Sequence, residues 1–219
     1  GVPDAVKALS VAMTFNDADS LEDILKADPD GVAAVILEPT GKTPAAPGFL
    51  QAVRDLTAKY GVILIFDEII TGFRVHMGGA QALYDITPDL SCFGKAMANG
   101  LPISALVGRR DLMMLLEDIF VSGTFGGEAL SLVAANATID KLEQHDGPNR
   151  IWRHGDKLIK AANAILDDYG LADLIQFGGE GWWPRMALGD PNPSTNLDTV
   201  LLTSLVRQEF MGAGLLFAA

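Results

Sequence analysis

The fold of this chain is set by the run Val62-Ile63-Leu64-Ile65-Phe66-Asp67-Glu68. Five consecutive apolar residues, rich in β-branched side chains, predict a strand that is buried on both faces of a sheet. The acidic pair Asp67-Glu68 marks the end of that strand. A similar apolar run occupies residues 32–37 and ends at Glu38-Pro39, where the proline would stop a second buried strand.

A helix is predicted between these two strands. Residues 48–60 place apolar side chains on one helical face, namely those of Phe49, Leu50, Val53, Leu56 and Tyr60. Gly61 is a natural C-terminal stop for this helix. Strand, helix and strand in this order indicate a parallel α/β sheet. Such sheets bind ligands beyond the carboxyl ends of their strands, where Glu38 and Asp67 both stand.

Further elements are predicted on either side of this unit. Ser20, with Asp23 as its capping-box partner, is expected to begin a helix that contains Leu21, Ile24 and Leu25. Strands are expected at residues 90–93 and 103–107, and helices at residues 80–84, 109–117 and 128–144. The last of these helices would turn four side chains inward, those of Leu132, Ala135, Ile139 and Leu142.

The break at Gly147-Pro148 is the expected domain boundary, which gives one domain over residues 1–147 and a second over residues 148–219. A helix to about Tyr169 and further elements at residues 174–177, 185–188 and 197–211 predict an α+β second unit. The end of the sequence, Leu215 to Ala219, is typical of a strand. Because a bare apolar strand leaves an unpaired edge, the chain is expected to be a fragment of a longer protein.

Composition excludes several classes of function. The formal net charge is -12, which argues against nucleic-acid binding, since that needs clustered Lys and Arg. No apolar run approaches the length of a membrane span and no signal peptide is visible, so a cytoplasmic protein that does not bind membranes is expected. The lone cysteine, Cys92, fits a reducing compartment.

Asp67 and Lys95 are the two residues that could carry chemistry. A carboxylate at the end of a buried strand needs a cationic or proton-donating partner, such as the protonated ring nitrogen of a cofactor. A structural salt bridge or a helix cap would serve equally well. Lys95 follows the apolar residues Cys92-Phe93-Gly94, so its amine could have a lowered pKa and act as a nucleophile, or it could be an ordinary surface lysine.

Two other motifs do not match the known pattern of a binding site. Gly41-Lys42-Thr43 is similar to the tail of a nucleotide-binding P-loop, but Ile36 stands where that pattern needs glycine. The histidines, His76, His145 and His154, have no cysteine or acidic partners at metal spacing, so no metal is expected.

An ordered series of short motifs is more specific than either residue alone. It consists of Asp67-Glu68-Ile69-Ile70-Thr71-Gly72-Phe73-Arg74, Gly78-Gly79-Ala80-Gln81, Pro88-Asp89-Leu90, Gly94-Lys95, Gly100-Leu101-Pro102-Ile103 and Gly108-Arg109-Arg110-Asp111. The series closely resembles the class III pyridoxal-phosphate (PLP) aminotransferases, with glutamate-1-semialdehyde aminomutase-like proteins as the nearest relatives. This resemblance runs through nearly the whole chain and is densest from Glu38 to Gly127.

The resemblance implies a role for each matching position. Lys95 would form the internal aldimine with PLP and then move the substrate proton, and Asp67 would pair with the pyridine nitrogen. Ile69 would pack against one face of the ring, and Thr124 would reach the cofactor phosphate of a neighbouring subunit. Glu38 would line the site near the substrate. The structural alternatives are a core residue for Ile69, a turn or cap residue for Thr124 and a strand-end charge for Glu38.

The same resemblance implies a PLP-transferase fold, with most of a large domain followed by part of a small one. It also implies a homodimer with a shared active site, and a small amino acid, keto acid or amino sugar as substrate. Three departures stand against it: the residues after Thr124 differ from the family's small-Asn-Pro pattern, the stretch 38–47 is short, and the family's amino-terminal phosphate loop and carboxyl-terminal part are not in this sequence.

Alternatives therefore stay open. The chain could be a cofactor-free α/β binding module, or a fragment without catalytic competence. Racemisation and decarboxylation share the same PLP core and are not excluded by the sequence.

Overall fold

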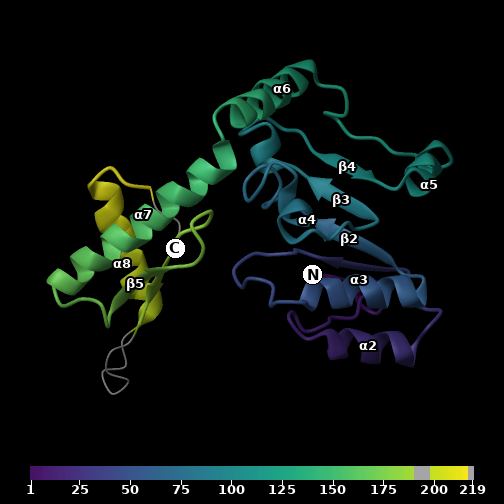
Figure 1. Cartoon of the computed structure of the whole chain (residues 1–219), viewed down its shortest axis with the longest axis horizontal. Coiled ribbons are helices and arrows are strands. Elements are labelled where there is room, and N and C mark those ends of the chain that lie inside the picture. Colours follow the sequence, from purple (N-terminus) through teal and green to yellow (C-terminus); the bar gives the residue numbers. More distant parts are fainter. Residues whose placement is uncertain (190–197, 217–219) are drawn as a thin grey trace. The chain divides into compact units, whose positions relative to one another are not determined.

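The computed structural model describes residues 1–189 and 198–216. The chain divides into two compact units, Gly1–His145 and Asp146–Ala219. Figure 1 labels their elements along the chain. The first unit contains α1 (Asp4–Lys7), α2 (Ala18–Ala27), β1 (Ala34–Leu37), α3 (Phe49–Tyr60), β2 (Ile63–Asp67), α4 (Gly79–Tyr84), β3 (Leu90–Phe93), η1 (Lys95–Met97), β4 (Ala105–Gly108), α5 (Arg110–Met113), η2 (Met114–Glu117) and α6 (Ala129–Gln144).

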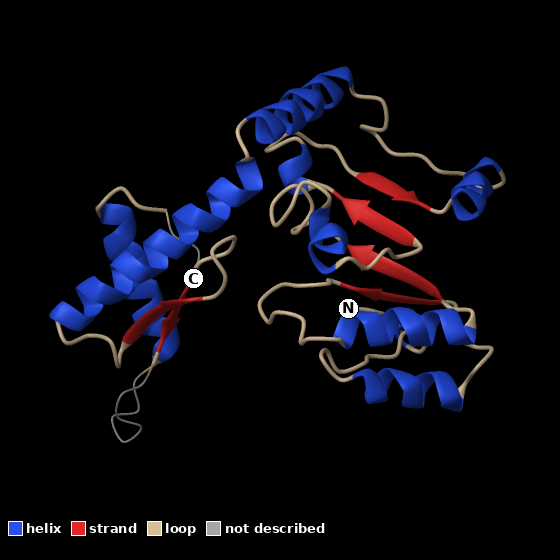
Figure 2. Ribbon diagram, viewed as in Figure 1, coloured by secondary structure: helices blue, strands red, loops and turns tan. Residues whose placement is uncertain are grey.

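The sheet of the first unit has the strand order β1-β2-β3-β4. β1, β2 and β3 run parallel, and β4 pairs with β3 antiparallel (Figure 2). The predicted α/β fold with a mostly parallel sheet is confirmed. Because the three parallel strands point the same way, their carboxyl ends meet at one edge of the sheet.

One face of this sheet carries the main core. Helices α2 and α3 lie side by side (Figure 1), α3 packs against β2, and the apolar residues of both helices share one core with those of β1 and β2. The buried members of this core are Leu21, Leu25, Val35, Phe49, Leu50, Val53, Val62, Leu64, Phe66 and Ile86. Alternate residues of β2 are fully buried, which fits the two-residue period of a strand.

The expectation of burial on both faces is wrong for β1. Its buried residue is Val35, whereas Ile36 is 62% exposed. Helices cover the face that carries Val35, and within residues 1–189 and 198–216 nothing buries the side chain of Ile36 on the other face.

Two helix predictions also need correction. The N-cap of α2 is Asp17 rather than Ser20, because the Asp17 carboxylate accepts the Ser20 N–H at 3.1 Å. Helix α6 buries Ala135 as expected, but Leu132 on the same helix is 48% exposed. Gly61 does end α3, with a left-handed φ of 69°.

The second unit contains α7 (Gly147–Asp168), β5 (Ile175–Gly178), β6 (Arg185–Leu188) and α8 (Thr199–Gly212), and β5 and β6 pair antiparallel. Asn163 of α7 bonds both backbone groups of Phe177, as its Oδ1 accepts the N–H and its Nδ2 donates to the C=O, each at 2.8 Å. The predicted start of the last helix at Leu197, and residues 217–219 of the predicted terminal strand, lie outside the described residues.

Among residues 1–189 and 198–216, no helix combines the length and the apolar character needed to cross a membrane. No group of three or more His, Cys, Asp or Glu side chains in the same ranges could hold a metal ion.

Candidate functional site

The candidate site lies at the carboxyl edge of the three parallel strands. Glu38 directly follows β1, Asp67 is the last residue of β2, and Lys95 follows β3 after Gly94. The fold therefore brings three of the five predicted site residues to one edge of the sheet. The side chains of Glu38 and Lys95 are exposed there, and that of Asp67 is partly buried.

Asp67 is held by its own turn. Its Oδ1 accepts the backbone N–H of Ile69 at 3.0 Å. In the register of the sheet it is paired with Cys92 of β3. Burial, and secondarily the charge of Asp67, raise the pKa of the Cys92 thiol. The charge of Asp67 therefore affects the ionisation of a residue in β3, the strand that precedes Lys95.

Lys95 has an unusual backbone conformation. Its φ is +40°, in the left-handed region that residues other than glycine rarely adopt. It opens the short helix η1, which is closed by the Met97 N–H donating to the Gly94 carbonyl at 3.0 Å. A conformation of this kind costs on the order of 1–3 kcal/mol and is often found at functional sites. The surrounding structure therefore imposes this backbone conformation on Lys95.

Ile69 connects the two strand ends. Its side chain is partly buried and lies beside Gly94, where an added Cβ would stand 3.7 Å from Ile69 Cγ2. This is an ordinary van der Waals separation. The residue that follows Asp67 by two positions thus packs against the backbone that precedes Lys95.

Glu68, for which no role was expected, is the centre of a buried hydrogen-bond network. Its carboxylate is fully buried and accepts the backbone N–H groups of Ala80 and Gln81, each at 2.8 Å, and the hydroxyl of Thr71. A buried carboxylate is stable only when such donors satisfy it. The signal in the sequence was an acidic residue at a strand end with Thr three positions later and Gly-Gly ten positions later.

Two glycines make room for this hub. Gly79 has a φ of +74°, and an added Cβ would lie 2.6 Å from both carboxylate oxygens of Glu68. Gly72 lies against Phe93, whose Cδ1 would be 2.3 Å from an added Cβ. The turn after Asp67 is therefore packed directly on the last residue of β3.

A second acidic hub, Asp89, lies at the other end of β3. It accepts the Leu64 N–H at 2.8 Å and forms ion pairs with Arg54 and Arg109, each at 3.0 Å. Burial alone would raise the pKa of the Asp89 carboxyl, but these donors together lower it below its ordinary value. Asp89 thus links α3, β2 and the residue that follows β4 at the edge opposite the candidate site.

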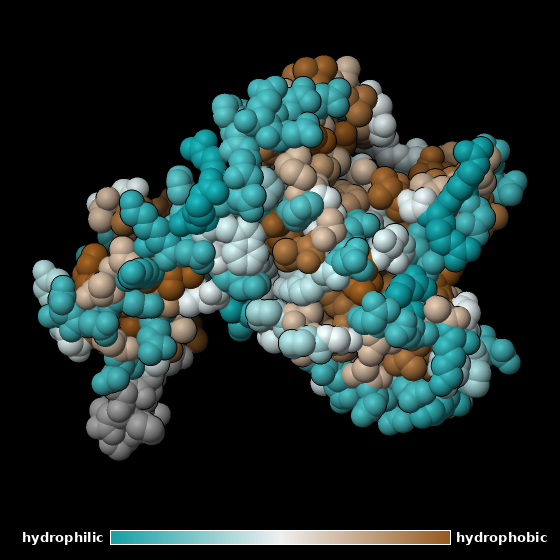
Figure 3. Space-filling view, in the orientation of Figure 1, coloured by the Kyte–Doolittle hydropathy of each residue, from teal (hydrophilic) through white to brown (hydrophobic). Residues whose placement is uncertain are grey.

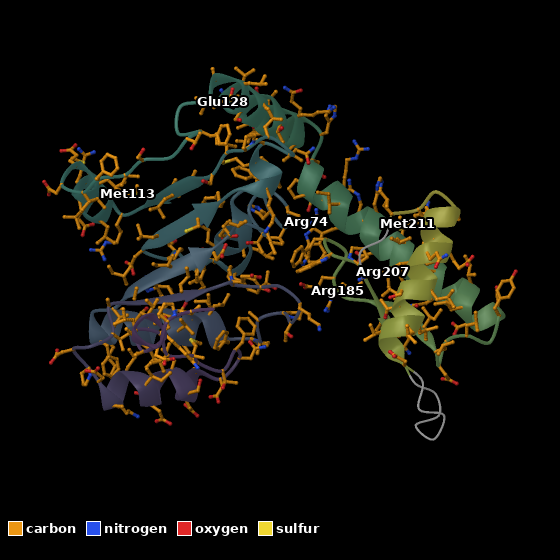
Figure 4. All side chains as sticks on the ribbon, turned by 180° about the vertical axis from the view of Figure 1, so that it is seen from behind. Arg74, Met113, Glu128, Arg185, Arg207 and Met211 are labelled. Atoms are coloured by element: carbon orange, nitrogen blue, oxygen red, sulfur yellow. The ribbon has the colours of Figure 1, made fainter. Side chains whose placement is uncertain are left out.

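Thr124 is not brought to this edge by any contact among the described residues. It lies exposed in a turn, where the Gly126 N–H donates to the Gly123 carbonyl at 3.1 Å. The turn leads to Glu128, the N-cap of α6, which is labelled in Figure 4. The Ser131 hydroxyl and the backbone N–H groups of Ser131 and Leu130 lower the pKa of Glu128. Leu130, Leu132 and Val133 near the start of α6 expose apolar side chains, although the face of this helix seen in Figure 3 is largely hydrophilic.

Comparison with known proteins places this chain in a family. The model of the family described as "Aminotransferase class-III" matches residues 4–179. Glutamate-1-semialdehyde 2,1-aminomutase of Pelotomaculum thermopropionicum is 45% identical over 151 residues, which are 66% of this chain and 35% of that protein. The 3-aminobutyryl-CoA aminotransferase of Cloacimonas acidaminovorans is 40% identical over 216 residues, or 94% of this chain and 52% of that protein.

Solved structures agree with this assignment. An omega-transaminase from Sphaerobacter thermophilus superposes with a TM-score of 0.83 at 28% identity, over 99% of this chain and 52% of that one. The FumI protein of Sphingopyxis sp. MTA144, solved in its PLP internal aldimine form, gives a TM-score of 0.75 at 32% identity, over 83% of this chain and 45% of that one. These likenesses confirm the predicted PLP-transferase fold.

The family model covers well over half of the sequence, and it spans the strand ends that carry Glu38, Asp67 and Lys95. The chain itself spans about a third to a half of the length of the curated relatives quoted above. This chain belongs to the class III aminotransferase family.

Proposed function

We propose that this chain is the cofactor-carrying part of a PLP-dependent enzyme that transfers amino groups, with Lys95 as the residue that holds the cofactor. The observation that supports the proposal is that a carboxylate residue, Asp67, and a lysine, Lys95, stand at the carboxyl ends of two adjacent parallel strands in a member of this family. PLP supplies an electron-withdrawing ring that stabilises negative charge on the carbon next to the amino group.

The residues at the edge fit this cofactor chemically. The amine of Lys95 is exposed, so it can reach an aldehyde, and its strained backbone gives the side chain an imposed direction. Asp67 uses Oδ1 for the Ile69 N–H, and among residues 1–189 and 198–216 no donor bonds its Oδ2, so that oxygen can accept from a protonated ring nitrogen. A partly buried carboxylate keeps that nitrogen protonated because an opposite charge stabilises the charged form.

Each residue would then have a defined role. Lys95 would hold the cofactor through its Nζ, and its amine, once released by the substrate, would take and return the proton next to the reacting amine. Ile69 supports one face of the ring, and Glu38 lines the substrate side. We also assign residues 1–147 to part of the large domain and residues 148–219 to part of the small domain of this fold.

The substrate is proposed to be a small amino or keto acid or an amino sugar. Two of the likenesses run through nearly the whole chain, and both are with transaminases, which favours transfer between two separate molecules. Transfer within one molecule is the second candidate, because an aminomutase is 45% identical over 151 residues.

Reductive trapping tests the cofactor assignment. The protein would be mixed with PLP, reduced with borohydride and digested, and the modified lysine would be located by mass spectrometry. We expect the adduct on Lys95. Lys95→Ala should abolish the adduct and the visible absorbance, whereas Lys59→Ala removes the same charge from an exposed lysine of α3 and should change neither. An adduct on another lysine in the unmodified protein would refute the assignment.

A second measurement addresses the reaction. The PLP-loaded protein, with any flanking sequence restored, would be offered an amino donor together with a keto acid, and separately glutamate 1-semialdehyde alone. Transfer to the keto acid supports the first candidate, and conversion of the single substrate supports the second. If the protein binds PLP but gives only racemised or decarboxylated products, amino transfer is excluded. Absence of PLP binding would favour a cofactor-free module or an incompetent fragment.

Thr124 is proposed to reach the cofactor phosphate of a neighbouring subunit in a homodimer. Its exposure in a turn, with apolar surface around the adjacent α6, supports a location at a subunit interface. Sedimentation of the PLP-loaded protein should give a dimer, and Thr124→Val should weaken PLP binding. A monomer with full PLP affinity would remove this part of the proposal.

A further inference from the structure

We propose that Glu68 is a positioning residue for Asp67. The buried carboxylate of Glu68 orients the carboxylate of Asp67, which would face the cofactor. This inference rests on the proposed function of Asp67. It goes beyond that function because it assigns the task of orientation to a residue that does not itself face a cofactor.

The backbone around Asp67 is tied on both sides through Glu68. The Glu68 N–H donates to the Cys92 carbonyl at 2.9 Å, which continues the β2–β3 pairing one residue past the strand. The Glu68 carbonyl accepts the Gly72 N–H at 2.7 Å, which closes the turn. These bonds hold the ends of the turn, and the side chain of Glu68 fixes where the rest of it lies.

That side chain is anchored on a separate element. Ala80 and Gln81 are in the first turn of α4, and their N–H groups point at the Glu68 carboxylate. Thr71 donates its hydroxyl to the same carboxylate from within the turn. The Gln81 side chain in turn donates to the Ser91 hydroxyl of β3 at 3.2 Å. Glu68 therefore couples the turn to α4, and α4 is coupled to β3.

Asp67 has little else to hold it. Among the described residues, its carboxylate accepts one hydrogen bond, from Ile69 N, which belongs to the turn that Glu68 anchors. A shift of the turn would thus move the one donor that orients Asp67. Since hydrogen bonds weaken steeply when distance or angle departs from the optimum, a small displacement would change the contact with a ring nitrogen.

The test compares two buried carboxylates. Glu68→Gln puts an N–H₂ group among the N–H donors of Ala80 and Gln81, whereas Asp89→Asn makes the same chemical change in the hub at the far end of β3. Both variants should lower the stability of the protein. Only Glu68→Gln should weaken PLP binding, by about tenfold, and move the visible band of the bound cofactor in the direction that Asp67→Asn moves it.

A double variant separates positioning from general damage. In the Asp67→Asn background, Glu68→Gln should cause no further shift of the band, because its effect passes through Asp67, although its effect on stability should persist. A shift of equal size in both backgrounds, or a Glu68→Gln protein with the PLP affinity and spectrum of the unmodified one, would overturn the inference.

If Glu68→Gln does not fold, Thr71→Val tests the positioning role of Glu68 instead. It removes one donor to Glu68 with little change of shape, and Thr71→Ser restores that donor. The Val variant should show the weaker binding and the shifted band, and the Ser variant should restore both. Failure of the unmodified protein to bind PLP would instead refute the proposed function, which is a distinct result.

Discussion

Replacing Gly79 with alanine should destabilise the protein by far more than its backbone conformation explains. At a φ of +74° an alanine pays about 1–2 kcal/mol for the left-handed region. The loss of freedom in the unfolded chain returns about 0.4–1 kcal/mol. The backbone contribution alone is therefore about 1 kcal/mol.

The larger contribution comes from Glu68. The new Cβ would lie 2.6 Å from both of its carboxylate oxygens, so the carboxylate must move away from Ala80 and Gln81. A hydrogen bond to a charged group contributes about 1.5–3 kcal/mol, so even one lost bond brings the total cost to about 3 kcal/mol.

Gly61 provides the matched control. Its φ is +69°, close to that of Gly79, but nothing lies within 4 Å of an added Cβ. Gly61→Ala should therefore cost only the backbone contribution of about 1 kcal/mol. Both variants would be compared by urea unfolding followed by far-UV circular dichroism, because all tryptophans lie in the second unit, at Trp152, Trp182 and Trp183.

If the two variants lose the same free energy of unfolding, the clash with Glu68 has no energetic weight. A further check uses the Glu68→Ala background, where Gly79→Ala should cost no more than Gly61→Ala, because the carboxylate that the new methyl group meets is gone.

Three other predictions follow from the same contacts. The pKa of Asp89 lies below its ordinary value of 3.8 in the folded chain, so its contribution to stability should be complete above that pH and be lost on further acidification. Asp89→Asn should cost about 3 kcal/mol at pH 7 and reduce the loss of stability on acidification. An unchanged dependence of stability on acid pH would contradict this. The charge of Asp67 helps to raise the pKa of the Cys92 thiol, so Asp67→Asn should speed alkylation of Cys92 by iodoacetamide at pH 8 by about threefold. Asp111→Asn, at an exposed position, is the control. A slower reaction of the Asp67→Asn protein would count against the proximity of Asp67 to Cys92. Asn163→Leu removes two side-chain hydrogen bonds to the backbone of Phe177 and should cost the second unit about 2 kcal/mol, measured by tryptophan fluorescence during urea unfolding. A cost near zero would mean that these two hydrogen bonds contribute nothing to the stability of the unit.

Much of the first unit could be predicted from local pattern. The apolar runs before Glu38 and Asp67, separated by an amphipathic helix that ends at Gly61, indicate parallel strands because this order of elements has few alternatives. Once the strands are parallel, the residues that follow them must meet at one edge. The presence of Glu38, Asp67 and Lys95 at that edge was therefore within reach of the sequence.

Local pattern could not predict which side chains carry the turn between them. Glu68 stands beside Asp67 in the sequence, and both are acidic residues at the end of the same strand. Successive side chains of a strand point to opposite sides, so only packing decides which carboxylate is buried under α4 and which stays at the edge. The positive φ of Lys95 is likewise a tertiary property, since no lysine prefers it.

Burial differed from expectation where it depends on distant segments. An apolar run predicts that Ile36 can be buried, but whether it is buried depends on what covers that face of the sheet. In the same way, the helical period placed Leu132 and Ala135 on one face of α6, and only the neighbours of that helix decide that Ala135 is buried and Leu132 exposed. Local patterns were enough to predict the order of the elements and the residue types at their ends, because neither depends on distant segments. Burial and side-chain orientation arise only in the folded chain, because both depend on residues that are far apart in the sequence.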